Sequence, residues 1–363
     1  MNKFKIFSVL LFIILIFIYQ NFGYENLTNI PIAFSLNDNY VYPLIVLLTS
    51  ILYNSSQNVF YIFYLLLSPD IKKKNIHKIL GLKAKYQKCK IKLLYMGEKY
   101  SNFYGGVYNT TAIYYRLELS NLITDVDKII YLDVDNIVHK DLTEFYNINM
   151  GKYYYLGFPG HDLVKFSFNG TRNFINSGVM LINLKKLREI NATKLFKDFY
   201  QKFGTRKYDE YILNGVFYDK IGFLPLKYGI PDFNKNNSKL RSPSYFVSIF
   251  KKLINFTEKD MEVASKNRVI SHGCYDLKKW WNKKYEDLTA IGKEWLYYAS
   301  KSHVFGEICD KYKQFKQYCK KIKKKIKSCL FFIYKKMRMT ISLEKHYYFL
   351  VNYDSLFNKF KNF

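Results

Sequence analysis

Short apolar runs alternate with helical patterns through the first part of the chain. Four runs have the length and composition of buried strands: residues 31–35, 59–67, 91–95 and 129–132. Between them, residues 42–53 are rich in Leu, Ile and Val, and residues 111–123 carry apolar side chains at helical spacing. Strands that alternate with helices predict an α/β domain with a mostly parallel sheet flanked by helices.

Two further strands are predicted in the second half of the chain. Asn176, Ser177 and Gly178 form a polar turn beside an apolar strand, and residues 269–273 form a short strand that contains a histidine near its end. Between these strands, the neighbouring carboxylates Asp209 and Glu210 are expected to begin a helix, where they complement the helix dipole. Helix capping therefore explains this pair unless other residues give it a further role.

Acidic side chains directly follow the apolar run at residues 129–132. Asp133 and Asp135 stand where that strand should end, and His272 has a similar place at the end of the strand at 269–273. Ligands of open α/β sheets bind beyond the carboxyl ends of the strands. Two carboxylates there suit Mg²⁺ or Mn²⁺, which in turn holds a diphosphate. The alternatives are an ordinary loop, in which Asp-X-Asp is common, and a structural histidine.

The composition is that of a folded and strongly basic protein. The 363 residues are 49% hydrophobic, with 31 Phe and 35 Tyr, which suffices for one large domain with appendages or for two small domains. A formal net charge of +28 favours a polyanion or an anionic membrane as partner. The chain has no Gly-X-Gly-X-X-Gly or Walker sequence, which disfavours a dinucleotide-binding domain and a phosphate-loop enzyme.

Much of the positive charge is concentrated near the carboxyl terminus. Residues 311–338 contain twelve Lys or Arg and no Asp or Glu. Apolar residues fall among them at alternating spacings of four and three: Phe315, Cys319, Ile322, Ile326, Cys329 and Ile333. An apolar stripe surrounded by lysines is typical of an amphipathic helix on a membrane surface. A basic helix packed on the domain is the alternative, and nucleic-acid binding is poorly supported without a recognition motif.

The five cysteines give little indication of a covalent framework. They are too few and too scattered for a set of disulfides, and no Cys-X-X-Cys pair indicates a structural zinc site. Cys309, Cys319 and Cys329 recur every ten residues, and we interpret this spacing as coincidence.

Residues 1–24 have the pattern of a signal peptide or signal anchor. Lys3 and Lys5 precede an apolar run at residues 6–19, and no small-residue cleavage site follows. An uncleaved anchor is therefore favoured, with the rest of the chain on the opposite side of the membrane from the lysines. This arrangement, with weak support from seven Asn-X-Ser/Thr sequons, predicts a single-pass type II protein of the endoplasmic reticulum or Golgi lumen. The inner face of a bacterial cytoplasmic membrane is the alternative.

Five segments, in this order, carry a resemblance to a known family: residues 34–40, Tyr114-Tyr115-Arg116-Leu117, Tyr131-Leu132-Asp133-Val134-Asp135, residues 174–183 and residues 272–280. Between residues 30 and 283 the chain resembles glycosyltransferase family 8, most of all the bacterial lipopolysaccharide α-galactosyl- and α-glucosyltransferases. The resemblance implies a GT-A fold, a bound Mn²⁺ and transfer from a UDP-sugar with retention at the anomeric carbon.

The same resemblance assigns roles to individual residues. It implies that Asp133, Asp135 and His272 ligate the metal, which stabilises the charge that develops on the UDP leaving group. The remaining family positions fall on residues expected to contact the donor: Asn37, Asp38 and Asn39 at uracil and ribose, Arg116 near the donor, Lys278 at the diphosphate, and Asn176 and Asp209 at the sugar hydroxyls.

Four residues in these motifs depart from the family pattern. Glu210 and Tyr211 replace Gln and Asp of a family triplet, and our hypothesis is that Glu210 stabilises an oxocarbenium-like centre or attacks it in a double displacement. Helix capping is the alternative role for Glu210. In the last motif, Tyr275 stands where Gly is expected and Lys279 where Pro is expected. A bulky Tyr275 weakens the expected diphosphate contact, whereas Lys279 adds charge.

The sequence thus predicts three parts: residues 1–24 as signal anchor or signal peptide, residues 25–290 as the GT-A domain, and residues 291–363 as a basic, aromatic, membrane-associating tail. The predicted function is Mn²⁺- or Mg²⁺-dependent retaining transfer of galactose or glucose from a UDP-sugar to a glycan, lipid-linked or protein acceptor. The alternative is an inactive relative that binds a sugar nucleotide or glycan. No nucleic acid is expected as partner.

Overall fold

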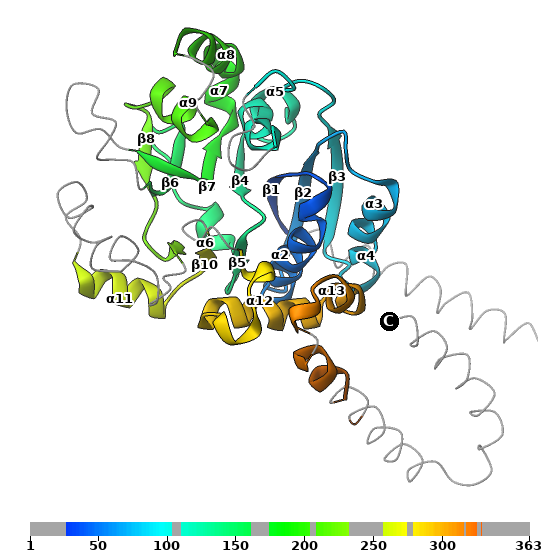
Figure 1. Ribbon diagram of the computed structural model, residues 1–363. Helices are drawn as coiled ribbons and strands as arrows, with labels where there is room; N and C mark the ends of the chain where they lie inside the picture. Colours follow the sequence, from blue (N-terminus) through cyan, green and yellow to red (C-terminus); the bar gives the residue numbers. More distant parts are fainter. Residues whose placement is uncertain are drawn as a thin grey trace, which may run out of the picture.

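A seven-stranded sheet forms the centre of the molecule, with strand order β3-β2-β1-β4-β7-β6-β8 (Figure 1). The computed structural model describes residues 27–103, 110–160, 174–203, 208–231, 257–273, 279–315, 317–324 and 328. The strands of the sheet are β1 (Thr28–Leu36), β2 (Val59–Leu67), β3 (Cys89–Tyr95), β4 (Lys128–Leu132), β6 (Tyr155–Pro159), β7 (Ile175–Asn183) and β8 (Ile221–Phe223).

Most neighbouring strands in this sheet are parallel. β1 pairs in parallel with β2 and β4, β2 with β3, and β6 with β8, whereas β7 runs antiparallel to both β4 and β6. The predicted α/β fold with a mostly parallel sheet is therefore confirmed. One detail differs: Asn176, Ser177 and Gly178, predicted as a turn before a strand, lie inside β7.

Helices cover both faces of the sheet. The α-helices are α2 (Val41–Tyr53), α3 (Lys73–Leu80), α4 (Leu82–Lys85), α5 (Leu119–Leu122), α6 (Thr143–Tyr146), α7 (Leu184–Glu189), α8 (Ala192–Phe203), α9 (Asp209–Val216), α11 (Glu258–Lys266), α12 (Ala290–Lys301) and α13 (Phe305–Lys311). The 3₁₀ helices are η1 (Asp38–Tyr40), η3 (Ala112–Glu118), η6 (Trp280–Asn282), η7 (Tyr285–Asp287) and η8 (Lys313–Phe315).

Two hydrophobic clusters lie on opposite faces of the strands. In β4, Ile130 and Leu132 belong to the cluster that includes α2 and α12, whereas Ile129 and Tyr131 belong to the cluster that includes η3, α7, α8 and α9. Successive side chains of a strand point to opposite faces, so a strand covered on both sides must be apolar throughout. This explains why the predicted strands are continuous apolar runs.

The segment at residues 111–123 is helical, but mostly of the 3₁₀ type. It consists of η3 and a single turn of α-helix, α5. Within η3, the Arg116 side chain donates from Nε to the carbonyl oxygen of Ile113 at 3.0 Å. An α-helix would offer that carbonyl to the backbone N–H four residues further on, so the buried guanidinium competes with regular α-helical bonding here.

A second, three-stranded sheet has the order β5-β10-β9, with β5 (Asn136–Val138), β9 (Tyr228–Pro231) and β10 (Ile270–His272). β10 is antiparallel to β5 and parallel to β9, and His272 pairs with Asn136. Because β5 begins one residue after Asp135, this pairing brings the end of β10 beside the acidic residues that follow β4.

The helices after residue 290 are part of the domain and not a separate tail. α12 packs on α2, and Trp295, Ile308 and Phe315 belong to the same buried cluster as α2. Of the predicted amphipathic stripe, Phe315 and Cys319 are buried in this cluster and Ile322 packs against it. These three residues are the first half of the stripe, and their packing agrees with the alternative of a basic helix that packs on the domain.

Cys309 and Cys319 form a disulfide, with their Cα atoms 6.0 Å apart. Our interpretation of the spacing of these cysteines as coincidence was therefore wrong. The bridge joins α13 to the segment that follows η8, where both sulfurs lie in the hydrophobic cluster. The sequence interval did not reveal the pair because the chain turns back between the two residues.

Within the described ranges, no helix is long and apolar enough to cross a membrane. The predicted signal anchor at residues 1–24 and most of the basic tail beyond residue 324 lie outside those ranges.

Candidate active site

Most of the predicted site residues line one cavity of about 300 Å³. It lies where β1 and β4 end, between these strands, the beginning of α9 and the end of β10. Eight of the predicted residues contribute to its wall: Asn37, Arg116, Asp133, Asp135, Asn176, Asp209, Glu210 and His272. The topology thus gathers residues from six separate segments of the chain into one polar cavity.

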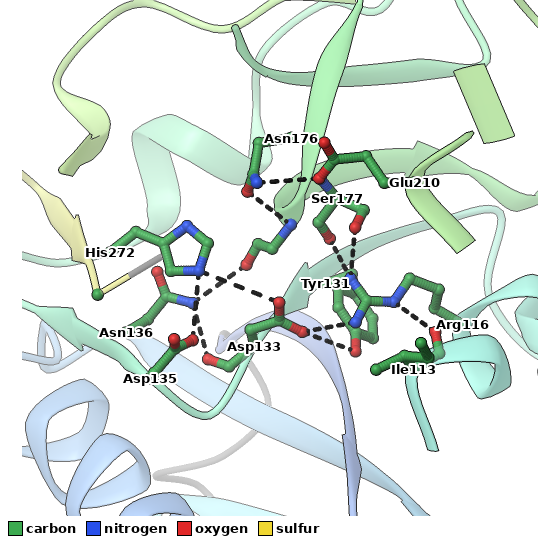
Figure 2. A network of polar contacts seen from close by, with 12 residues as sticks. Ile113, Arg116, Tyr131, Asp133, Asp135, Asn136, Asn176, Ser177, Glu210 and His272 are labelled. Carbon is green, nitrogen blue, oxygen red and sulfur yellow. Dashed lines mark hydrogen bonds and ion pairs between the residues drawn. The ribbon is translucent and has the colours of Figure 1, made fainter. Parts of the chain in front are cut away.

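Asp133, Asp135 and His272 converge at one side of this cavity (Figure 2). One ligand atom of each lies within 4.8 Å of the others. Nε2 of His272 is 3.2 Å from Oδ1 of Asp135 and 4.0 Å from Oδ2 of Asp133. Two carboxylate oxygens and an imidazole nitrogen at this spacing fit a divalent cation such as Mn²⁺.

The two carboxylates differ in their surroundings. Asp135 is buried, which by itself raises its pKa, yet its pKa lies well below the usual range, because the electrostatic interactions and hydrogen bonds with Lys279 and His272 outweigh the effect of burial. Lys279 Nζ donates to Asp135 Oδ2 at 2.5 Å. Asp133 is more accessible, with 30% of its side chain exposed. Asp135 is therefore a buried carboxylate paired with Lys279, whereas Asp133 is the more exposed of the two.

Arg116 is the buried centre of the second half of the site. Its Nη2 donates to Asp133 Oδ1 at 2.8 Å, and its Nε lies 3.1 Å from Asp209 Oδ2. The guanidinium also lies over the ring of Tyr131, whose hydroxyl donates to Asp133 Oδ1 at 3.1 Å. This fork of donors fixes Oδ1 of Asp133 and leaves Oδ2 directed toward His272.

Ser177 connects Arg116 to Asp209. The Arg116 Nη1 donates to the backbone oxygen of Ser177 at 2.6 Å and to its Oγ at 2.9 Å, and the Ser177 hydroxyl donates to Asp209 Oδ2 at 2.9 Å. Burial raises the pKa of Asp209, against the opposing charge of Arg116. The polar triplet Asn176-Ser177-Gly178 is recognisable in the sequence, but this role of Ser177 is not.

Glu210 reaches from the first turn of α9 to β7. Its Oε2 accepts hydrogen bonds from Asn176 Nδ2 at 3.0 Å and from the backbone N–H of Ser177 at 3.2 Å. Asn176 in turn accepts from the Gly178 N–H at 3.0 Å. Glu210 therefore does more than complement the dipole of α9, because its carboxylate lies on the cavity wall beside Asn176.

Of the three residues predicted to contact uracil and ribose, only the first lines the cavity. Asn37 lines the cavity, and its Oδ1 accepts from the Asn39 N–H at 3.1 Å. Asp38 is not in the wall, because its carboxylate accepts from the Lys72 N–H at 3.0 Å and from Asn75 Nδ2 at 2.7 Å. Asp38 thus fixes the start of α3, and Asn39 also lies outside the cavity wall. Neither position confirms the predicted donor contact.

Several positions complete the comparison of prediction and structure. Lys278 and Tyr275 lie outside the described residues. Tyr40, Tyr208 and Tyr211 line the cavity, and sequence reasoning did not distinguish Tyr40 or Tyr208 from the other tyrosines. Tyr40 follows directly after the polar cluster at the end of β1, a placement that could have indicated it.

Residues 31–284 match the model of a protein family described as "Glycosyl transferase family 8". A putative glycosyltransferase of Haemophilus influenzae is 28% identical over 273 residues, which cover 70% of this chain and 73% of the relative.

Among solved structures, the galactosyltransferase LgtC in complex with donor and acceptor sugar analogues has a TM-score of 0.60 and 21% identity, covering 75% of this chain and 96% of that one. The glycosyltransferase GlyE of Streptococcus pneumoniae has a TM-score of 0.52 and 20% identity, covering 75% of this chain and 61% of that one. At these identities, the two structures show a shared fold.

Proposed function

The chain belongs to glycosyl transferase family 8, and from this membership we propose a retaining transfer of galactose or glucose from a UDP-sugar to a glycan, lipid-linked or protein acceptor. Glycosyl transfer follows from the family. The hexose and the nucleotide are our inference, supported by the similarity in fold to a galactosyltransferase solved with donor and acceptor sugar analogues. One observation carries the proposal: Asp133, Asp135 and His272 converge in the cavity that also contains Asn176 and Glu210.

In this proposal, Asp133 Oδ2, Asp135 Oδ1 and His272 Nε2 would hold Mn²⁺ or Mg²⁺. Such an ion supplies electrostatic stabilisation of a diphosphate leaving group. Arg116 and Tyr131 orient Asp133 by occupying its other oxygen. The protein therefore holds these carboxylates aligned before any ligand enters, which is the preorganisation that makes electrostatic catalysis effective.

The donor would lie between this trio and the β7–α9 side of the cavity. Asn37, which lines the cavity at the end of β1, is proposed to contact the nucleoside, and Asn176 and Asp209 are proposed to bind the hydroxyls of the sugar. Asn176 and Ser177 hold the Glu210 carboxylate in place. We assign to Glu210 the stabilisation of positive charge at the anomeric carbon.

A double displacement is the stronger form of this role. A Glu210 oxygen would form a bond to the anomeric carbon while the bond to the UDP phosphate oxygen breaks. An acceptor hydroxyl would then form its own bond to that carbon, release the carboxylate and lose its proton to the departing diphosphate or to water. Two inversions at one carbon give net retention.

The alternative function is that of an inactive relative that binds a sugar nucleotide or a glycan. Tyr211 favours it, because a bulky side chain lines the cavity where the family has an aspartate. Intact Asp133, Asp135 and His272 argue against it, because they keep the ligand set that metal-dependent transfer requires.

The experiment that tests the proposal is UDP release from a panel of UDP-sugars, first with Mn²⁺ and then with excess chelator. Release from one sugar that stops with chelator would identify the donor. UDP binding that depends on metal, without release from any donor, would favour the inactive relative or a strict need for the acceptor. Absence of UDP binding under both conditions would contradict both functions.

We propose the lumen of the secretory pathway as the compartment. The Cys309–Cys319 disulfide supports an oxidising environment, because cytosolic thiols are kept reduced. The apolar segment at residues 6–19 supports a type II membrane anchor. Membrane binding by the basic tail beyond residue 324 stays a prediction, to be tested with anionic vesicles and a chain that ends at residue 324.

A further inference from the structure

Lys279 occupies an unusual position for a lysine. Its side chain lines the cavity and is only 15% exposed, and its ammonium group donates to Asp135 Oδ2 at 2.5 Å and to the Gly273 carbonyl at 3.0 Å. Lys279 immediately precedes η6, which begins with the buried Trp280. The backbone there is fixed by packing, while the four-carbon side chain reaches back over the end of β10.

Each of the two acidic ligands has one oxygen bound to a cationic side chain. Arg116 holds Oδ1 of Asp133, and Lys279 holds Oδ2 of Asp135. The other two oxygens face Nε2 of His272. The candidate metal position is therefore flanked by two positive charges that belong to the protein itself.

These two charges are not equivalent. Arg116 is locked between Asp133, Asp209 and Ser177, with 4% of its side chain exposed. Lys279 donates to a carboxylate and to a carbonyl in the wall of the cavity, through a flexible side chain. An ammonium group is a point charge that binds phosphate from many directions, whereas a guanidinium in a fixed network has one arrangement. Lys279 is therefore better suited than Arg116 to give up its hydrogen bond to an aspartate and to donate to a ligand oxygen instead.

We propose that Lys279 is a resident cation for the donor diphosphate, which makes nucleotide binding possible without a divalent ion and weakens binding of that ion to the nucleotide-free protein. This inference rests on the proposed UDP-sugar function. Its physical basis is Coulombic: a positive charge beside Asp135 repels an incoming divalent cation and attracts a diphosphate. It differs from the family expectation, in which proline stands at this position.

Two substitutions remove the charge in different ways. Lys279→Met keeps the length of the side chain, and Lys279→Pro restores the family residue at a backbone φ of −58°, which proline adopts without strain. Lys279→Arg keeps the charge. Lys92→Met is the matched control, since Lys92 also pairs with an aspartate, Asp125, but on the β3 strand at the edge of the sheet, outside the cavity wall.

The first measurement is calorimetric binding of UDP to the full chain in EDTA. Wild type and Lys92→Met should bind, and Lys279→Met and Lys279→Pro should bind roughly 10- to 100-fold more weakly, the loss expected for a charge-assisted hydrogen bond. Lys279→Arg should retain most of the affinity. The second measurement is Mn²⁺ binding without nucleotide, followed by electron paramagnetic resonance, and it should be tighter in both charge-removing variants than in wild type.

The outcomes separate this inference from the proposed function. UDP binding in EDTA that is unchanged in Lys279→Met and Lys279→Pro overturns the role of Lys279. Wild-type binding that requires Mn²⁺ also overturns it, while leaving the metal-dependent transferase intact. If wild type binds UDP in neither EDTA nor Mn²⁺, the proposed function fails and this inference fails with it. Thermal unfolding of each variant identifies any loss of binding that comes from misfolding.

Discussion

Gly178 touches His272 so closely that no side chain fits between them. A Cβ atom added at Gly178 would lie 2.6 Å from Nε2 of His272 and 2.8 Å from Oδ2 of Asp133, closer than real Cβ contacts. Both neighbours are proposed metal ligands. The absence of a side chain at Gly178 is therefore a condition for bringing the end of β4 and the end of β10 together.

Gly178→Ala should disable the site without unfolding the protein. The added methyl group must displace the imidazole or the carboxylate, and a displacement of about 1 Å at a reacting centre costs on the order of 100-fold in kcat/KM. Steady-state kinetics and Mn²⁺ binding would measure the loss. Gly306→Ala is the control, because a Cβ at Gly306 in α13 meets nothing within 4 Å. Equal activity of the two variants would contradict the proposed geometry.

Arg116→Met should lower the free energy of unfolding by about 3–5 kcal/mol, the cost of breaking a buried ion pair by removing one partner. The reason is Asp209, which is 5% exposed and would lose its cationic partner. Adding Asp209→Asn should restore part of the loss. Urea unfolding measures both changes.

The control for Arg116 is Lys194→Met, which breaks an exposed pair with Asp198 on α8 and should cost no more than about 0.5 kcal/mol. An Arg116→Met protein as stable as this control would show that Arg116 does not neutralise buried charge.

Glu210→Gln should leave UDP binding unchanged and slow transfer by roughly 100-fold, as expected when charge complementary to the transition state is removed. The amide oxygen of glutamine can still accept from Asn176 and Ser177, so the wall keeps its shape. Single-turnover transfer from the identified donor is the measurement. Glu262→Gln on the exposed side of α11 is the control. If the Glu210→Gln variant transfers at the wild-type rate, Glu210 has only the structural role of joining α9 to β7 by hydrogen bonds.

Reduction of the Cys309–Cys319 disulfide should lower the free energy of unfolding by about 2–3 kcal/mol, as expected for a short closed loop. Urea unfolding with and without reductant measures the change. In the double variant Cys309→Ala and Cys319→Ala, reductant should have no such effect. Peptide mapping should find the two cysteines linked and resistant to alkylation, and free thiols at both positions in protein isolated without reductant would contradict the bridge.

The strands could be predicted from the sequence because burial on both faces demands uninterrupted apolar residues. β2 agrees with the predicted residues 59–67, since the polar triplet Ser68-Pro69-Asp70 ends the apolar run. The convergence of Asp133, Asp135 and His272 could be predicted in part for a related reason: a carboxylate or imidazole at the end of a buried strand lies at the edge of the sheet. Strand position indicated each residue separately, and only the resemblance to family 8 predicted that the three act together as metal ligands.

What could not be predicted depends on contacts between distant segments. Ser177 gains its role only because β7, η3 and α9 meet, and no local pattern distinguishes its hydroxyl from that of any other serine. Asp38 directly follows β1, where a contact with the nucleotide was predicted. Its carboxylate instead accepts a hydrogen bond from the backbone N–H of Lys72 at the start of α3. The disulfide requires the Cα atoms of Cys309 and Cys319 to lie close together. The turn between α13 and the next segment brings them together, and the sequence spacing does not show that turn.

The small sheet has a consequence for the order in which the protein matures. β10 lies between β5 and β9, and it delivers His272 from late in the chain to a strand that precedes it by more than half of the domain. His272 is thus synthesised long after Asp133 and Asp135, so the three proposed ligands are present together only once the chain has been made through β10. Because a domain folds as a unit, the site and the core that α12 completes should form at the same late stage of synthesis.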